Sequence, residues 1–495
     1  MAKFNLPNSI HTVNRSGYIA YEFSARERFV TAVLTTMFGE PKYYGSTDND
    51  IVRLAVRFAE SDPAFLAKLA CYARNDGHMR SVSHVLAAVI ARHARAYTRP
   101  VIRQITLRPD DITEIMSCYL SLYGKPFPNA MKREIAESIQ RFDEYQLAKY
   151  NGGDRALKLR DVLRITHPVP RTAETEALFR KLLDGTLEIP YTWETELSRR
   201  GNTREVWNEL IASGKVGYMA LLRNLRNIVR SGADLRPVLQ RLADPREVRR
   251  SRQLPFRFYS AYRTLCRDRL MTPAIQAALE AALTASIGNM DPIPGRTLVA
   301  VDVSGSMSSR VSGRSDIRCC DIAALFGAMA HHLCEDATVC YFDAAYFSQK
   351  EQKTLKGYRI VRYGREDSIL EICLKSSFAG GGTDLSLPMK YALEEDPFAR
   401  RRPFDRVIYF SDNECNSSYR GLYKTVQGLV DTYRARYNRD FWVHGIDLMG
   451  YGTQQFCGER FNVIAGWSES VFPFISLAEA GLSTLVETID SIDLG

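Results

Sequence analysis

The chain has 495 residues, of which 45% are hydrophobic and 25% are charged, a balance typical of folded globular domains. This composition excludes disordered, collagen-like and very small disulfide-rich proteins, and the length predicts roughly two to four domains. The sequence contains no apolar run of about eighteen residues, and its first residues, MAKFNLPNSI, lack the apolar core of a secretory signal. We therefore expect a cytoplasmic protein that does not cross a membrane.

The cysteines agree with that location. Ten cysteines are present, none of them in a C-x-x-C pair, and most lie inside apolar stretches. Such cysteines are typical of reduced, buried thiols rather than of disulfides or a zinc site.

Charge is distributed unevenly along the chain. Residues 1–294 carry 44 basic and 31 acidic side chains, a net charge of +13, whereas the remaining residues carry 22 and 26, a net charge of −4. This asymmetry favours a polyanionic partner for the first part of the chain. Basic helical surfaces are also commonly just solvated, and charge alone leaves both interpretations open.

Residues 1–290 are predicted to form consecutive helices. Apolar residues follow helical spacing, and Asp62 followed by Pro63 is a helix start signal. Helices are expected around residues 51–58, 63–75, 81–96, 111–123, 129–142, 158–165 and 215–231, with further ones to about Ile287. Short helices with short links are typical of HEAT-like arrays, although no fixed repeat period is visible.

The pattern changes near residues 291–295. Short apolar runs predict strands, and helical segments separate several of them. The predicted strands are 297–303, 337–343, 358–363, 406–411, 441–448 and 461–465. This alternation predicts a doubly wound, mostly parallel α/β domain over residues 295–495. Ligands of such sheets bind at the carboxyl ends of the strands, which directs attention to the loops that follow.

Three of these loops carry oxygen ligands suited to a hard divalent ion. They contain Asp302, Ser304 and Ser306, then Thr383 after a glycine triplet, and then Asp412. Two carboxylates and three hydroxyls fit Mg²⁺, which prefers oxygen ligands and retains waters. The pattern resembles the metal-ion-dependent adhesion site of von Willebrand factor A domains, and the resemblance implies that these five residues hold the ion directly or through water. A vestigial, empty site is the alternative. We find no phosphate-binding loop, H-E-x-x-H or G-x-S-x-G motif, and we expect no enzymatic activity.

Motifs throughout the chain resemble the Ro 60 kDa autoantigen family, whose members combine a TROVE module with a von Willebrand factor A domain. The segments that carry the resemblance are Gly17-Tyr18, Tyr43-Tyr44-Gly45, LKLRDVLRITHP at 157–168, GYMALLRNLRN at 217–227, LPFRFYSAY at 254–262, GGGTDLSLPM at 380–389 and Ser411-Asp412-Asn413-Glu414. The resemblance implies a monomeric ring of HEAT-like helices, residues 1–290, closed by the A domain. It also implies that a basic hole receives single-stranded 3′ ends of misfolded RNAs and that the outer face binds Y-like small RNAs. Bacterial relatives are associated with exoribonucleases.

Two basic groups are candidate RNA contacts. The first comprises Lys149, Lys158, Arg160, Arg164 and His167, where His167 is carried over from the family's R-[LI]-[ST]-H-x-x-P context; a helix-capping histidine is the alternative. The second comprises Arg223, Arg226 and Arg230, which recur on one helical face and suit a row of phosphates, or simply a solvated face. The competing function is a protein adaptor whose metal site captures an acidic partner.

Overall fold

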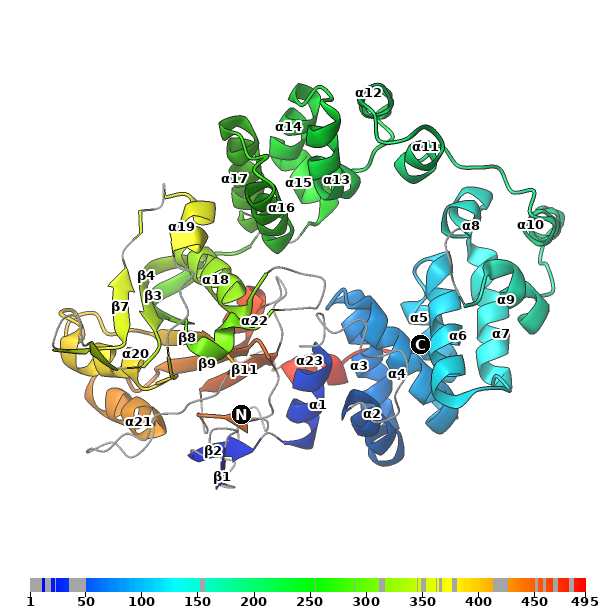
Figure 1. Cartoon of the computed structure of the whole chain (residues 1–495). Helices are drawn as coiled ribbons and strands as arrows, with labels where there is room; N and C mark the ends of the chain where they lie inside the picture. The colour runs from blue at the N-terminus through cyan, green and yellow to red at the C-terminus, as the bar shows by residue number, and fades with distance from the viewer. Residues whose placement is uncertain are drawn as a thin grey trace. The chain divides into compact units, whose positions relative to one another are not determined.

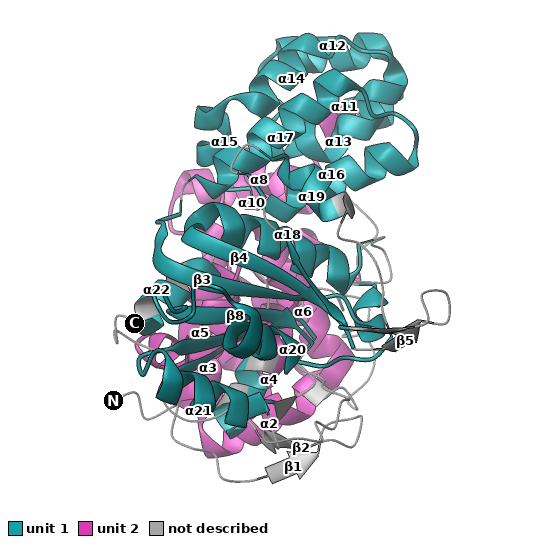
Figure 2. Cartoon of the chain, turned by 90° about the vertical axis from the view of Figure 1, so that its left-hand side faces the viewer, with its two compact units in different colours: residues 1–31, 196–484 teal, residues 32–195, 485–495 magenta. Residues whose placement is uncertain are grey.

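The computed structural model describes residues 11–13, 19–22, 24–34, 50–151, 156–253, 255–288, 290–310, 317–344, 346–348, 353–361, 363–364, 367–375, 381–412, 426–449, 453–456, 460–465, 471–479 and 485–495. The chain divides into two compact units, shown in two colours in Figure 2. Residues 32–195 and 485–495 form the first, here called the helical unit. Residues 1–31 and 196–484 form the second, here called the sheet unit because it holds the large sheet.

The helical unit consists of short helices packed on their neighbours. They are α2 (Asp50–Ser61), α3 (Pro63–Asn75), α4 (Arg80–His93), α5 (Thr98–Ile105), α6 (Pro109–Tyr123), α7 (Asn129–Ser138), α8 (Glu144–Tyr150), α9 (Leu159–Thr166), α10 (Ala173–Asp184) and the C-terminal α23 (Leu485–Asp490) (Figure 1). The predicted start signal is confirmed, because the Asp62 side chain accepts a hydrogen bond from the Phe65 N–H at 3.3 Å. Lys68 of α3 also donates to the backbone carbonyl of Asp490, which ties the end of the chain to this unit.

A second group of helices belongs to the sheet unit. It contains α12 (Arg204–Ala212), α13 (Tyr218–Ser231), α14 (Arg236–Ala243), α15 (Pro245–Ser251), α16 (Pro255–Arg267) and α17 (Pro273–Ile287). Helices α1 (Ala25–Leu34) and α11 (Trp193–Arg200) run across two of the three points where the chain passes between units. Tyr218 of α13 and Phe258 of α16 pack edge to face in the buried core of this group.

Six of the described strands form one sheet. They are β3 (Ile293–Asp302), β4 (Cys334–Phe342), β7 (Tyr358–Val361), β8 (Arg406–Ser411), β9 (Trp442–Asp447) and β11 (Phe461–Ala465), in the order β11-β9-β8-β3-β4-β7. All pairings are parallel except that of β7 with β4. The chain reverses its direction of winding between β3 and β8, which is where doubly wound sheets bind ligands.

Helices cover both faces of this sheet. On one face lie α18 (Cys319–Leu333) and α22 (Val471–Glu479), where Phe326 stacks on Phe410 with ring centroids 5.5 Å apart. A Cβ on Gly327 would lie 2.6 Å from a methyl of Val301, so α18 approaches β3 as closely as a glycine permits. The other face packs against α20 (Leu387–Lys390), its π-helical continuation (Tyr391–Glu395) and α21 (Val426–Arg436). The α19 helix (Ile369–Lys375) lies beside α18.

The structure confirms the predicted change of architecture and adds one feature. The last of the helical series ends at Ile287 and the first strand of the sheet begins at Ile293, as the composition of 291–295 indicates. The compact units are not divided there, because α12–α17 belong with the sheet. Strands within residues 1–290 were not predicted: β1 (His11–Val13) pairs with β2 (Ile19–Glu22), and β2 pairs with β10 (Thr453–Gln454).

Two further expectations concern the whole chain. No helix in the described part of the chain is long and apolar enough to span a membrane. Eight of the ten cysteines lie among the described residues, where all are free thiols and all but Cys266 are buried, as predicted. Cys415 and Cys457 lie outside the described residues.

Candidate functional site

The predicted metal residues come together at the carboxyl edge of the sheet, at its switch point. Asp302 ends β3, and Ser411 and Asp412 end the adjacent strand β8. Because Val301 pairs with Phe410 in parallel register, Asp302 lies beside Ser411. The Ser411 hydroxyl donates a hydrogen bond of 2.6 Å to Oδ2 of Asp302, while the Ser304 N–H donates to Oδ1 at 2.9 Å. The Asp302 carboxylate is therefore held at both oxygens.

The two remaining loop segments meet the first one. The hydroxyl oxygens of Ser304 and Ser306 are 3.2 Å apart, so the turn after β3 presents them side by side. The Gly305 N–H donates to the Gly381 carbonyl at 3.1 Å, which brings the glycine segment before Thr383 against this turn. Thr383 is buried. The turn after β3 is therefore in contact both with the end of β8 and with the glycine segment that precedes Thr383.

The electrostatics of this site favour a cation. Asp302 and Asp412 both have no exposed surface, and burial together with the nearby Asp412 charge raises the pKa of Asp302 to about 7. Two buried carboxylates repel each other unless a positive charge lies between them or one takes up a proton. The described residues contain no group of three or more His, Cys, Asp and Glu side chains arranged to hold a metal, so the candidate depends on two carboxylates supplemented by hydroxyls. That donor set fits Mg²⁺ with retained waters.

Sequence reasoning assigned no role at this site to two residues next to it. Ser411 was named only as part of the segment before Asp412, whereas in the structure its hydroxyl orients the Asp302 carboxylate. Asp447 ends β9 in register with Ser411, is fully buried, and accepts a hydrogen bond from the Met449 N–H at 2.9 Å. Its position at the carboxyl end of a parallel strand is the signal that could have found it.

The first predicted RNA group lies in the helical unit, on α8 and α9. Lys149, Lys158, Arg160, Arg164 and His167 are all exposed, and within the described residues none of them forms an ion pair. His167 is the C-cap of α9, with φ of +47° and its N–H bonded to the Leu163 carbonyl at 2.9 Å. The backbone of His167 therefore caps the helix while its side chain is open to solvent. Arg155, which precedes this run, lies outside the described residues.

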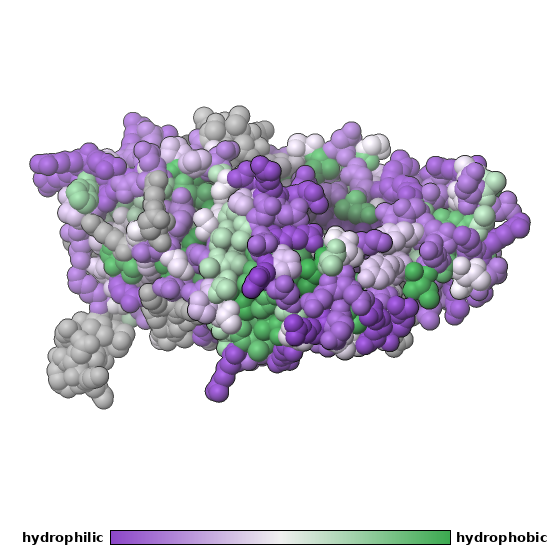
Figure 3. Space-filling model, turned by 90° about the horizontal axis from the view of Figure 1, so that it is seen from above, coloured by the Kyte–Doolittle hydropathy of each residue, from purple (hydrophilic) through white to green (hydrophobic). Residues whose placement is uncertain are grey.

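The second predicted group lies on α13 in the sheet unit, and its three arginines differ in whether they form ion pairs. Arg230 pairs with Asp268 at 2.9 Å, and Arg226 approaches the same carboxylate at 3.7 Å. Arg223 is exposed and unpaired among the described residues. Residues 196–288 carry 17 basic and 8 acidic side chains, so this segment has a net charge of +9. Hydrophilic side chains predominate on the face that Figure 3 presents.

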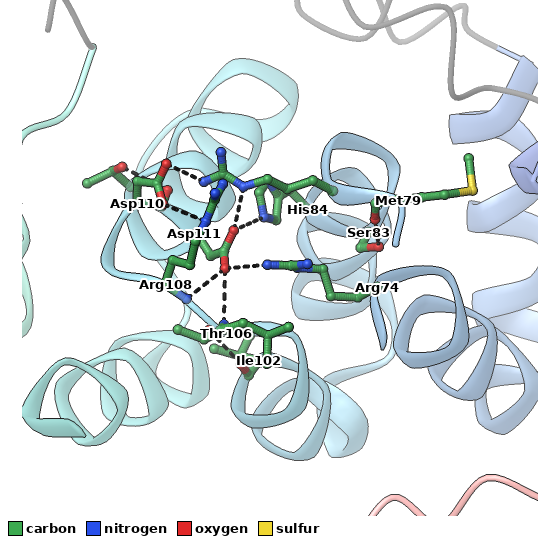
Figure 4. Close-up of polar contacts among 12 residues, drawn as sticks. Arg74, Met79, Ser83, His84, Ile102, Thr106, Arg108, Asp110 and Asp111 are labelled. Carbon is green, nitrogen blue, oxygen red and sulfur yellow. Dashed lines mark hydrogen bonds and ion pairs between the residues drawn. The ribbon is translucent and has the colours of Figure 1, made fainter. Parts of the chain in front are cut away.

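A buried polar cluster joins α3, α4 and α6 in the helical unit, and α6 packs against α8 and α9, which carry the first basic group. Asp111, at the start of α6, accepts hydrogen bonds from Arg74 at 2.9 Å, Arg80 at 2.7 Å and His84 at 3.0 Å (Figure 4). It also accepts from the backbone N–H groups of Leu107 and Arg108. Burial alone would raise the pKa of Asp111, but the His84 hydrogen bond and the two arginine charges hold it well below its usual range.

This cluster extends to the surface through aromatic rings. The Arg108 guanidinium lies 5.3 Å from the ring centre of Tyr150, and the Lys149 ammonium lies 5.7 Å from the same ring. Lys149 is also 5.8 Å from the ring centre of Tyr145, an exposed residue. Lys149 thus lies near two aromatic rings of α8, and a cation beside aromatic faces can contact both phosphates and bases.

Comparison with known proteins identifies both parts of the chain. The TROVE domain model matches residues 40–186 and 185–267, and the Ro60 vWA domain model matches residues 296–440. "Telomerase protein component 1" of Rattus norvegicus is 29% identical over 300 residues, which cover 43% of this chain and 11% of that protein. "RNA-binding protein RO60" of Deinococcus radiodurans is 28% identical over 218 residues, 40% of this chain and 37% of that protein. The matches thus span well under half of the length of these relatives.

A solved structure shares the fold. The crystal structure of the Deinococcus radiodurans RO (RSR) protein superimposes on this chain with a TM-score of 0.61 and 19% sequence identity. The aligned region covers 92% of this chain and 100% of that protein's chain. Its agreement supports the order of a helical-repeat part followed by an A-type sheet. The TROVE and Ro60 vWA domain models match the chain in this same order, helical part first and sheet second. The chain therefore belongs to the Ro 60 kDa family, with a TROVE domain followed by a Ro60 vWA domain.

Proposed function

We propose that the protein is a non-catalytic RNA-binding protein of the Ro type, which holds structured or defective RNAs. The observation that carries the proposal is the row of exposed basic side chains on α8 and α9, none of which pairs with an acidic side chain in the described part of the chain, within the region that the TROVE model matches. A row of this kind offers phosphate contacts without sequence preference. Tyr145 and Tyr150 beside Lys149 add faces on which unpaired bases can stack.

We assign different roles to the two basic groups. The α8–α9 group, including His167, is proposed to bind a folded, Y-like small RNA. The α13 group belongs to the segment 196–288, which has a net charge of +9 and is proposed to receive the single-stranded 3′ ends of other RNAs. An exoribonuclease is the proposed protein partner, since held 3′ ends are the substrates of such enzymes. The sheet site is proposed to bind Mg²⁺ and to have a structural or docking role.

The test compares one RNA hairpin with and without a single-stranded 3′ tail, in a salt series. The proposal predicts tighter binding of the tailed RNA, with an affinity that falls steeply with salt because each phosphate contact releases a counterion. A plot of log affinity against log salt concentration should have a slope of about −3 or steeper if roughly four or more phosphate contacts form with a single strand. Weak binding that ignores the tail would contradict the proposal.

A second candidate is a protein adaptor, favoured by the metal site alone. An ion held by two carboxylates and hydroxyls retains open positions, which a carboxylate from a partner protein can fill. This function predicts Mg²⁺-dependent capture of an acidic peptide, together with RNA binding that is weak and indifferent to the tail.

A further inference from the structure

Helix α16 contacts the start of α18 through a buried carboxylate. Asp321, in the first turn of α18, has no exposed surface and accepts hydrogen bonds from the Arg318 backbone N–H at 2.9 Å and from its guanidinium. Arg263 of α16 adds a third donor, with its Nη1 3.3 Å from Oδ1 of Asp321. Helix α16, which lies within the TROVE match, therefore supplies Arg263 as a charge partner for the buried Asp321 of the A domain.

Helix α17 makes a similar contact with the start of α19. The Glu280 carboxylate accepts from the Ser368 hydroxyl at 2.7 Å and from the N–H groups of Ile369 at 2.7 Å and Leu370 at 3.2 Å. These N–H groups belong to the first turn of α19, where no partner within the helix is available. Glu280 thus acts as a capping residue supplied by another part of the chain.

The helix that α16 anchors begins next to the metal site, and the helix that α17 anchors packs against it. Helix α18 follows the Asp302–Ser306 turn, and the Cys319 N–H at its start donates to the Ser309 carbonyl at 3.0 Å. Helix α19 lies against α18. The contacts from α16 and α17 therefore both support the packing of α18, next to the turn that carries Ser304 and Ser306.

We propose that Arg263 and Glu280 are positioning residues for the divalent-cation site, and that cation binding in turn strengthens the packing of α16 and α17 on the A domain. The inference rests on the cation site proposed above. Hydroxyl ligands bind weakly and depend on exact placement, so residues that hold their loops contribute to affinity without touching the ion. Reciprocity follows from linkage, because any contact that raises cation affinity is itself strengthened by the cation.

The experiment measures Mg²⁺ binding to the full chain by calorimetry, with Glu280→Gln, Arg263→Gln and the control Arg250→Gln. Arg250 lies on α15 and pairs with Glu247 of the same helix. Each of the first two substitutions should weaken Mg²⁺ binding about tenfold, the smaller effect expected of residues that act on metal ligands indirectly, while Arg250→Gln leaves it unchanged. Arg263→Lys, which keeps the charge opposite Asp321, should restore most of the affinity.

Hydrogen exchange supplies the reciprocal readout. Mg²⁺ should slow amide exchange in α16 and α17 of the wild-type chain, and this protection should disappear in Asp302→Ala. Unchanged Mg²⁺ affinity in both Glu280→Gln and Arg263→Gln would overturn the inference while leaving the cation site intact. Absence of Mg²⁺ binding to the wild-type chain would overturn the site and the inference together, and the hairpin experiment would still decide RNA binding separately.

Discussion

The hydroxyl of Ser411 bonds to the carboxylate of Asp302 across the two central strands, at 2.6 Å, in the interior of the candidate metal site. The two residues are 109 positions apart in sequence, and parallel pairing of β3 with β8 brings them together. The arrangement of the candidate site is therefore a product of the sheet topology, because residues at both strand ends contribute to it.

Removal of the central carboxylate should abolish cation binding. Saturating Mg²⁺ should raise the Tm of the wild-type sheet unit, because a ligand at about a hundred times its Kd adds about 2.7 kcal/mol to the free energy of unfolding. Asp302→Ala should show no Mg²⁺-dependent rise. Asp431→Ala, which removes an exposed carboxylate of α21, serves as the control and should behave as wild type. A Tm rise that persists in Asp302→Ala would exclude Asp302 as a ligand.

Ser411→Ala should weaken Mg²⁺ binding without abolishing it. The substitution removes the hydrogen bond that orients Asp302 but leaves every proposed ligand in place, and outer-shell partners of metal ligands typically contribute about ten- to a hundredfold in affinity. Calorimetric titration with Mg²⁺ measures the change. An affinity equal to that of the wild type would mean that the bond does not orient the ligand.

Much of the sheet part could be predicted from sequence, for identifiable reasons. Buried parallel strands are short, β-branched and apolar, so 297–303 and 406–411 were recognisable and match β3 and β8. Metal residues follow strand ends, so their convergence could be inferred from the order of the strands. The role of Ser411 could not, because it depends on which strand neighbours β3.

The helical part shows where local patterns stop being informative. The spacing of Arg223, Arg226 and Arg230 places them correctly on one face of α13, but spacing says nothing of Asp268, which lies beyond the end of α16 and pairs with two of them. In the same way, Arg263 and Glu280 look like ordinary surface charges of amphipathic helices. Their contacts with α18 and α19 join segments 58 and more positions apart, which no local pattern predicts.

Substitutions on α9 should weaken binding of a folded RNA. Arg160→Gln with Arg164→Gln removes two exposed charges that form no ion pair with any residue the structure describes. The logarithmic salt slope should become shallower by about 2 if each contacts a phosphate of a duplex. The control is Arg171→Gln with Arg180→Gln, which removes two exposed arginines that pair with Glu137 and Glu176. Filter binding of a hairpin RNA over a salt series measures the slopes. Equal losses in both double variants would mean that only net charge matters.

His167→Ser tests the same surface without a large change of charge. The His167 backbone caps α9, and serine can retain that hydrogen bond, so the helix should persist. Binding of a Y-like stem should fall several-fold, while binding of single-stranded tails should be spared. Gel-shift titrations with each RNA make the comparison, and circular dichroism checks the helix content. Equal loss with both RNAs would point to one shared site.

Arg223 should contribute more to single-strand binding than Arg230. Arg230 is neutralised by Asp268, whereas Arg223 has no ion pair among the described residues, so its charge is available to a phosphate. Arg223→Gln should lower the affinity for a single-stranded oligonucleotide several-fold, and Arg230→Gln should lower it less. Conversely, Asp268→Asn should raise the affinity by releasing Arg226 and Arg230. Fluorescence anisotropy at fixed salt ranks the three variants, and the reverse order for the two arginines would contradict the assignment.

The Asp111 cluster should make the helical unit sensitive to acid. The folded-state pKa of Asp111 is depressed, so its contribution to stability is present above the unfolded value near 3.8 and is lost as the pH falls below it. His84 also lowers the stability of the folded state as the pH falls, and it does so at a higher pH than Asp111. Burial lowers the pKa of His84, so below about pH 6.5 the unfolded chain takes up a proton that the folded chain does not. Stability should therefore fall from pH 7 downward in two stages.

Asp111→Asn separates this cluster from general acid effects. The amide leaves the buried Arg74 without its charge partner, which should cost about 3–5 kcal/mol at pH 7. The acid-dependent loss below pH 4 should then be reduced, because the carboxylate that must be protonated is absent. Asp184→Asn, an exposed residue at the end of α10, should change neither quantity. Hydrogen exchange in α3, α4 and α6 between pH 4 and 7 follows this unit alone, after correction for intrinsic exchange rates. A pH profile identical to that of the wild type would show that the stability of these helices does not depend on the Asp111 carboxylate.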